Sequence, residues 1–177
     1  RNNKTLKSYI YSLPINKFLE YQKQNLPIDP YWLGLWLGDG LSSNTSVCSI
    51  DKDIIKYCKE YAKKLGLNYS IRENIEGKHK DFKYCTIINQ RGKNNVLRDK
   101  LRELSIWEDK NIPDIYLYSS EEQRLELLRG LMDTDGCCYT KGQVEFTSSI
   151  PKLAKSFEQL VRSLGIQVKV KQQIPTY

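Results

Sequence analysis

The decapeptide YWLGLWLGDG at residues 31–40 places two glycines inside an apolar run and ends the run with an acid and a glycine. A glycine inside a helix costs about 1 kcal/mol relative to alanine, and in a strand both would leave gaps in the row of side chains. Gly34 and Gly38 are four residues apart, so in a helix they share one face. Removing the side chains from one face lets a second backbone approach that face closely.

The segment SSEEQRLELLRGLMDTDG at residues 119–136 has the same design. Asp29 is suited to cap the first helix and Gly40 to end it. Ser120 and Gln123 predict a capping box at the start of the second helix, which again ends at an Asp-Gly pair. The two segments therefore predict two similar helices, each terminated by an acid.

The chain repeats itself in two successive blocks. Aligning the two segments pairs Gly34 with Gly130, Gly38 with Thr134 and Asp39 with Asp135, at an offset of 96 (135 − 39). The amphipathic pattern of Ile54, Cys58, Tyr61, Ala62 and Leu65 then recurs at Leu153, Phe157, Leu160, Val161 and Leu164, at an offset of 99 (153 − 54). Two motifs in the same order indicate an internal duplication, with three extra residues in the second hairpin.

Hydrophobic periodicity and turn residues predict the remaining elements. The first unit is predicted to contain helix 30–39, a strand near 45–50, helix 51–65, strands near 67–73 and 82–90, and a helix at about 93–105. The second is predicted to contain helix 120–135, strands near 137–140 and 143–148, helix 151–164 and strand 166–171.

The repeated acids suggest a metal site. Two helices with matching small faces would pack side by side about a pseudo-twofold axis and bring Asp39 and Asp135 together. Both carboxylates would then lie at helix C-termini, where the macrodipole is negative, and each would disfavour ionisation of the other. A divalent cation offsets this repulsion, and hard oxygen ligands suit Mg²⁺. A simpler interpretation makes each Asp-Gly pair a helix stop, but it leaves the repetition unexplained.

The charge balance indicates the kind of partner. The chain has 28 Lys and Arg against 21 Asp and Glu, a formal net charge of +7, which favours nucleic acid ahead of a membrane surface. No apolar stretch approaches the roughly 20 residues of a membrane span. The five cysteines form no CxxC pair, which favours buried or incidental thiols over a zinc or redox motif, and His79 is expected to be solvated.

Three motifs together resemble a known family. WLGLWLGDG and LRGLMDTDG look like the paired dodecapeptide motifs of the LAGLIDADG homing endonucleases, the second more closely. In the first, Trp36, Leu37 and Gly38 replace Ile-Asp-Ala, but the acidic position is kept. KNIP at 110–113 is similar to the Lys-x-Ile-Pro element that precedes the second motif in intein-encoded members. The resemblance covers most of the chain.

The resemblance implies a mixed α/β (α+β) fold of two pseudo-twofold halves. Each half would pack helices on a curved antiparallel sheet, and the halves would meet at the paired motif helices. Residues 29–119 match the first half and 120–177 a second half that is expected to be truncated, because the symmetry mate of Lys110 would fall at 206 to 209 (110 + 96 to 110 + 99). Residues 1–28 would be a linker or a DNA-contacting arm.

The resemblance also assigns roles to residues. Asp39 and Asp135 would bind the catalytic metal, Mg²⁺ with Mn²⁺ as a substitute, and Lys110 would be the active-site lysine of the first half. Four small residues would pack the motif helices together: Gly34, Gly38, Gly130 and Thr134. The sheets and their rims would face DNA in the major groove, and they carry Arg72, Lys80, Lys83, Arg91, Lys93, Lys141, Lys169 and Lys171.

The leading hypothesis is therefore a monomeric, Mg²⁺-dependent endonuclease that cuts double-stranded DNA at a long, rare site. It would act inside the cell, in the nucleus or cytoplasm, with an intein splicing domain in the same precursor. An alternative is a nucleic-acid-binding module on the same fold that no longer cuts, such as a degenerate intein domain or an RNA-splicing maturase. A basic structural domain without a nucleic-acid role would leave the duplicated Asp-Gly unexplained.

Overall fold

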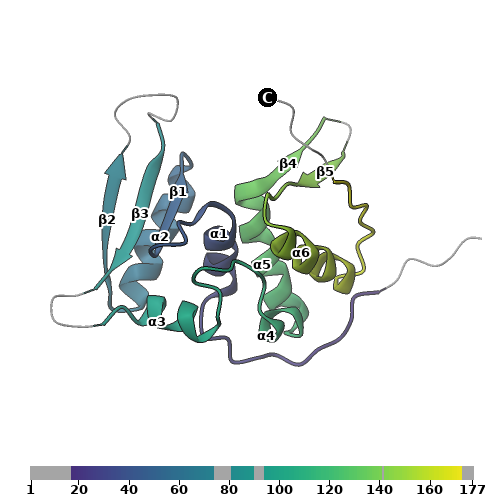
Figure 1. Ribbon diagram of the computed structural model, residues 1–177, viewed down its shortest axis with the longest axis horizontal. Coiled ribbons are helices and arrows are strands. Elements are labelled where there is room, and N and C mark those ends of the chain that lie inside the picture. Colours follow the sequence, from purple (N-terminus) through teal and green to yellow (C-terminus); the bar gives the residue numbers. More distant parts are fainter. Residues whose placement is uncertain (1–16, 74–80, 90–93, 141, 173–177) are drawn as a thin grey trace, which may run out of the picture.

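Two helices lie side by side at the centre of the molecule. The computed structural model describes residues 17–73, 81–89, 94–140 and 142–172. Within them, α1 (Pro30–Asp39) and α5 (Glu121–Asp135) stand between a three-stranded sheet on one side and a two-stranded ribbon on the other (Figure 1). This arrangement confirms the predicted mixed fold of helices and small antiparallel sheets.

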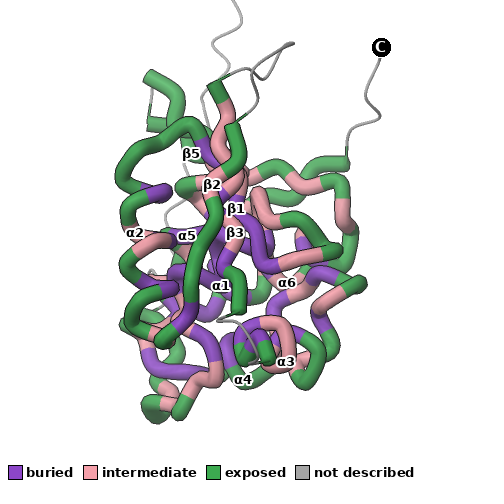
Figure 2. The backbone as a smooth tube through the Cα atoms, turned by 90° about the vertical axis from the view of Figure 1, so that its left-hand side faces the viewer, coloured by how far each residue is buried: buried purple, intermediate pink, exposed green. Residues whose placement is uncertain are grey.

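The first half contains the larger sheet. Its remaining elements are β1 (Ser46–Ser49), α2 (Lys52–Lys64), β2 (Asn68–Glu73), β3 (Lys83–Ile88), α3 (Val96–Glu103) and the short α4 (Asp114–Leu117). The strand order is β1-β3-β2, with both pairings antiparallel. Val47, Cys85 and Ile87 are buried in the core, whereas β2 is mostly exposed, as the green tube in Figure 2 shows.

The second half repeats the start of the first. After α5 come β4 (Gly136–Cys138), β5 (Val144–Phe146) and α6 (Pro151–Ser163). Gly40 pairs with Val47 in the first half, and Gly136 pairs with Phe146 in the second. The pairing partner is thus seven residues away in one hairpin (47 − 40) and ten in the other (146 − 136), which accounts for the change of offset from 96 to 99.

One predicted strand is wrong. Residues 166–171 have no strand conformation, and most of this segment is exposed. Its counterpart in the first half, β2, is held by a complete antiparallel ladder with β3. No described residue of the second half offers such a partner to 166–171. Because a strand needs a neighbour for its backbone hydrogen bonds, the alternating apolar pattern alone does not make one.

The helix α1 is buried on all sides. Every residue from Tyr31 to Leu37 is buried, which fits a helix that is apolar around its whole circumference. Asp29 caps α1 by accepting hydrogen bonds from two backbone N–H groups, and the predicted capping box of Ser120 and Gln123 is present at the start of α5. Among the helices of the described residues, none combines the length and apolar character that a membrane crossing requires.

A strap formed by residues 17–28 ties the second half to the start of α1. It runs along the bottom of the molecule in Figure 1 before entering α1. The side-chain amide of Gln123 pairs with both backbone groups of Gln24, at 2.9 and 2.7 Å. The Tyr116 hydroxyl does the same for Ile28, at 3.0 and 2.9 Å. The strap is therefore a packed part of the fold.

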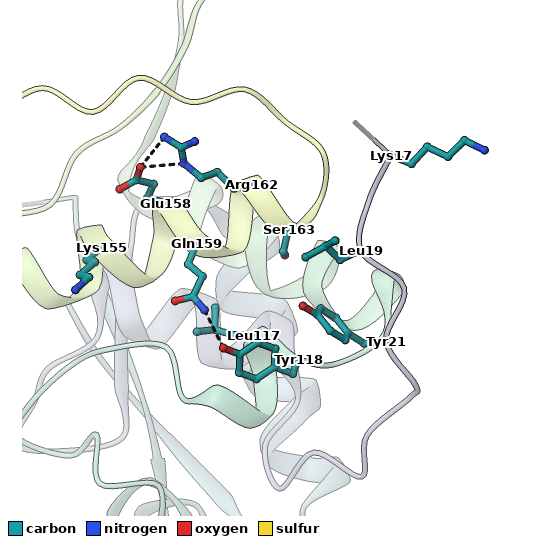
Figure 3. Close-up of a pocket in the computed structure, with 10 residues that line it drawn as sticks. All are labelled: Lys17, Leu19, Tyr21, Leu117, Tyr118, Lys155, Glu158, Gln159, Arg162 and Ser163. Carbon is teal, nitrogen blue, oxygen red and sulfur yellow. Dashed lines mark hydrogen bonds and ion pairs between the residues drawn. The ribbon is translucent and has the colours of Figure 1, made fainter. Parts of the chain in front are cut away.

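A buried arginine anchors the other end of the strap. The Arg124 guanidinium donates hydrogen bonds to the carbonyl oxygens of Ser119 and Ser163, at 2.9 and 2.8 Å, and also to that of Leu19. It is fully buried, and the Tyr21 ring lies 5.0 Å from the guanidinium carbon. Beside it, Leu19, Tyr118 and Arg162 help to line a cavity of about 640 Å³ between the strap, α4 and α6 (Figure 3).

Candidate active site

The two repeated acids occupy equivalent places in the fold. Asp39 is the last residue of α1 and Asp135 the last residue of α5, and both are half-buried. Each is followed by a glycine whose backbone N–H closes the final helical turn. In both cases the chain then enters an extended segment that joins a hairpin. The duplication seen in the sequence therefore places two carboxylates at the same end of two adjacent helices.

Direct backbone contact brings these helix ends together. A Cβ atom on Gly34 would lie 2.5 Å from the carbonyl oxygen of Leu127 and 2.9 Å from the Cα atom of Gly130. One turn further on, a Cβ on Gly38 would overlap the side chain of Thr134 and lie 3.4 Å from Asp135 Oδ2. The four small residues singled out in the sequence thus line the contact between α1 and α5. Any larger side chain at the glycines would push the helices apart.

Lys110 points into the same region from the segment between α3 and α4. Its ammonium group donates a 2.6 Å hydrogen bond to the carbonyl oxygen of Gly40 and a 3.3 Å bond to that of Gly38. The residue is only 5% exposed, which is unusual for a lysine. Carbonyl groups at a helix C-terminus carry partial negative charge, so they stabilise the ammonium in place of water.

The three charged groups influence one another. Burial raises the pKa of Asp39, and the positive charge of Lys110 opposes that rise. Burial also raises the pKa of Asp135, assisted by the negative charge of Asp39 and opposed by Lys110. For Lys110, burial lowers the pKa to about 8, and the two carboxylates limit the fall. A site with two acids and one lysine therefore has excess negative charge in poorly solvated surroundings.

These residues fit a hard divalent cation. Within the described part of the chain, no hydrogen bond engages the carboxylate oxygens of Asp39 or Asp135, so their lone pairs are free to bind an ion. The described residues contain no group of three or more His, Cys, Asp or Glu that would enclose a metal by themselves. Magnesium is commonly bound by only one or two carboxylates, with water and substrate phosphate completing its coordination. The two acids match that donor set.

The basic residues proposed to face DNA are divided by the structure. Arg72 lies opposite Tyr84, whereas Lys83 lies opposite Glu73 and forms a 2.6 Å ion pair with it. Since side chains alternate along a strand, Arg72 and Lys83 are on opposite faces of the sheet. Lys83 shares the face of the buried Cys85, so the two residues do not form one continuous surface, and their contact with DNA stays a prediction.

The other six basic residues receive less support from the structure. Lys169 and Lys171 are exposed, but the predicted strand that was to present them is absent. The remaining four lie outside the described residues: Lys80, Arg91, Lys93 and Lys141. His79 and the arm residues 1–16 lie outside them as well.

Two features near the site were missed by the sequence reasoning. Trp36, treated only as a departure from the motif, faces the Lys110 ammonium, which lies 5.1 Å from its ring centroid. The face of the sheet that carries Arg72 also carries a row of hydroxyl groups, in which the exposed Ser70 and the buried Ser46 flank the half-buried Thr86. The period-two alternation of β3 would have pointed to this row, but nothing local in the sequence connects Trp36 with Lys110.

Comparison with known proteins places the chain in a family. A model of the homing endonuclease family matches residues 28–110, the stretch from the end of the strap to Lys110. A model of a LAGLIDADG-like domain matches residues 122–176, which include α5 and Asp135. The two matches fall on the two halves of the fold and together cover most of the chain. The chain belongs to the LAGLIDADG homing endonuclease family.

One curated relative matches nearly the whole chain. The replicative DNA helicase DnaB of Mycobacterium intracellulare is 30% identical over 165 residues, which are 93% of this chain and 22% of that protein. The chain therefore spans about a fifth of the length of this relative.

Proposed function

We propose that the chain is a metal-dependent endonuclease that cuts double-stranded DNA at a specific site. The observation that carries this proposal is the convergence of Asp39, Asp135 and Lys110 at one end of the paired helices. Family membership, the net charge of +7 and the open polar face of the larger sheet support the same conclusion.

The two carboxylates have a binding role in this proposal. Asp39 and Asp135 would hold Mg²⁺, or Mn²⁺ in its place, because their oxygens are half-buried and free of other donors. A bound divalent cation supplies an activated water and neutralises charge on the phosphate, which are the requirements of phosphodiester hydrolysis. The raised pKa values of both acids indicate that a cation is favourable there.

Lys110 supplies positive charge to the same reaction. Its ammonium is held by two carbonyl oxygens at the C-terminal end of α1, those of Gly38 and Gly40, and keeps a further N–H for a phosphate oxygen or a water. In poorly solvated surroundings, a fixed positive charge stabilises the negative charge that develops on phosphate in the transition state more strongly than it would in water.

The open face of the sheet is the proposed recognition surface. Arg72 and Tyr84 form one cross-strand pair on this face, and Ser70 and Thr86 form the next. Hydroxyl, phenol and guanidinium groups are suited to the donor and acceptor pattern of base edges in the major groove. Contacts to phosphates would supply most of the affinity and its salt dependence.

We further propose that the domain is inserted in a host protein as the endonuclease of an intein. The match to a fifth of a replicative helicase is the pattern expected of a mobile insertion. The KNIP element, in which Lys110 and the buried Ile112 occur, is shared with intein-encoded members by resemblance. This origin implies a splicing domain in the same precursor, a DNA substrate inside the cell, and a single chain that acts as a monomer.

The decisive experiment uses a duplex that joins the two flanks of the host gene as they stand without the insertion. The whole chain is incubated with it in Mg²⁺, in Ca²⁺ and in EDTA, alongside Asp39→Asn and Asp135→Asn. A double-strand cut at the junction, dependent on Mg²⁺ and lost in either variant, is expected. Tight binding of this duplex or of its transcript without cutting in any metal would instead make the chain a binding module.

A further inference from the structure

The ammonium of Lys110 lies in a three-sided seat. Two sides are the carbonyl oxygens of Gly38 and Gly40, which accept its hydrogen bonds at 3.3 and 2.6 Å. The third is the indole face of Trp36, whose centroid is 5.1 Å from Nζ. An aromatic face attracts a cation and restricts where it can move, and this matters most when water is excluded. Both Trp36 and Lys110 are buried.

The indole is itself fixed from three directions. Its Nε1–H donates a 3.0 Å hydrogen bond to the carbonyl oxygen of Asn44. Trp107 stacks on it, with ring centroids 6.3 Å apart and planes inclined by 18°. Its edge also lies against the backbone of Gly40, where a Cβ atom would be 2.5 Å from Trp36 Cδ1. The ring therefore presents an oriented surface to the lysine.

The second half has no equivalent of this ring. Met132 stands at the position that corresponds to Trp36 (132 − 36 = 96), and its Cε atom covers Gly136 just as the indole covers Gly40. The space beside the helix end is thus filled in both halves, but only the first half fills it with an aromatic face. The packing requirement alone does not explain a tryptophan at this position.

We propose that Trp36 is a positioning residue that holds the Lys110 ammonium beside Asp39 and Asp135. The effect of Trp36 on catalysis rests on the proposed endonuclease function, whereas the positioning of the ammonium by the indole does not depend on that function. A lysine has a flexible four-carbon stem and a compact charge, so two carbonyl acceptors leave it free to swing about them. The indole face removes that freedom and keeps the charge where the phosphate would lie.

The test compares Trp36→Met, which installs the residue of the second half, with Trp36→Phe, which keeps an aromatic face. Trp32→Met is the matched control, because Trp32 is an equally buried tryptophan one turn earlier in α1 that packs on Tyr61. The first measurement is the NMR shift of the Lys110 ε-CH₂ protons, assigned with Lys110→Met. A ring-current shift is expected in the wild type and in Trp32→Met, reduced in Trp36→Phe and absent in Trp36→Met.

The second measurement is cleavage of the flank-joined duplex. Trp36→Met is expected to lower kcat by roughly 10- to 100-fold with KM nearly unchanged, and Trp36→Phe to recover most of the loss. If the Lys110 ε-CH₂ signals of the wild type show no ring-current shift, the proposed contact between the Trp36 ring and the lysine is wrong, and this conclusion does not depend on whether any variant folds. A wild type that cuts, with equal kcat in Trp36→Met, overturns the positioning role alone. If the wild type shows the ring-current shift but never cuts the duplex, the proposed endonuclease function is wrong, and so is the catalytic role of Trp36. The contact between the indole and the Lys110 ammonium is still supported in that case.

Discussion

The hydroxyl group of Tyr31 donates a 2.8 Å hydrogen bond to Asp133 Oδ2 and so links the two central helices by their side chains. Asp133 is exposed and is already paired, whereas Asp135, two residues later, is half-buried, and its carboxylate accepts no hydrogen bond from the described residues. Two acids of one motif therefore have different surroundings. This difference supplies the control for the first prediction.

Asp135→Asn should abolish cleavage and raise thermal stability. Burial raises the pKa of this carboxyl, so the folded state holds its proton more tightly than the unfolded state, and ionisation at neutral pH weakens the fold. Removing the charge relieves that cost, and for a chain of this size 1 kcal/mol corresponds to about 2–4 °C in Tm. Calorimetry in metal-free buffer and a cleavage assay in Mg²⁺ check the two effects. Asp133→Asn should retain cleavage, and an equal loss of cutting there would contradict the assignment.

Gly130→Ala should destabilise the protein, although alanine is the better helix former by about 1 kcal/mol. The new Cβ would overlap the carbonyl oxygen of Tyr31 and lie 3.0 Å from the Cα atom of Gly34. We expect a loss of about 3 kcal/mol in the free energy of unfolding, and a larger loss for Gly130→Leu. Urea titration measures both. Gly66→Ala, where nothing lies within 4 Å, should lose only about 1 kcal/mol from its positive φ.

The burial of Lys110 should become less costly as pH rises. Its pKa of about 8 in the folded state is below the ordinary 10.5, so the unfolded state binds more protons between these values and stability increases with pH across that window. The difference in the free energy of unfolding between Lys110→Met and the wild type should therefore shift by about 2 kcal/mol in favour of the wild type between pH 7 and 9.5. Urea titrations of both proteins in metal-free buffer test this. A constant difference would mean that the amine is solvated.

A divalent cation should stabilise the wild type but not the doubly neutralised protein. An ion that binds only the folded state adds RT ln(1 + [L]/Kd), which is about 2.7 kcal/mol at a concentration of 100 Kd. Melting curves with Mg²⁺, with Mn²⁺ and with EDTA should separate for the wild type. They should coincide for Asp39→Asn combined with Asp135→Asn. Separation that persists in this variant would place the ion elsewhere.

Arg124→Met should loosen the strap from the second half. The substitution removes the guanidinium donor from the carbonyl oxygen of Leu19 and from the buried carbonyl oxygens of Ser119 and Ser163, at a cost of about 1–3 kcal/mol for each of the two buried groups. The amide of Leu19, which donates to Ser163, should then exchange with solvent faster than in the wild type. Arg129→Met removes an exposed arginine from the same helix and should leave that exchange rate unchanged.

The features that were best predicted from the sequence are those that are repeated along the chain or that depend on neighbouring residues. The helix caps at Asp29 and Ser120 follow from residues within a single helical turn, and the three-residue difference between the hairpins follows from comparing the two repeats. The strand at 166–171 was wrong because pairing depends on a partner strand, which an alternating pattern does not supply. The Trp36 contact with Lys110 and the buried Arg124 were missed because both join residues that lie far apart in the chain.

The bare backbone contact between Gly34 and Gly130 has a consequence for how such a protein can change. Since no side chain separates the helices there, the distance between the two acidic ends is set by main-chain geometry, and ordinary substitutions cannot tune it. Residues on the open face of the sheet, such as Ser70 and Thr86, are free of that constraint. Under the proposed function, the fold keeps the fixed spacing of the two acids separate from the surface that would contact DNA, so substitutions on that surface could change the target sequence without altering the spacing of the acids.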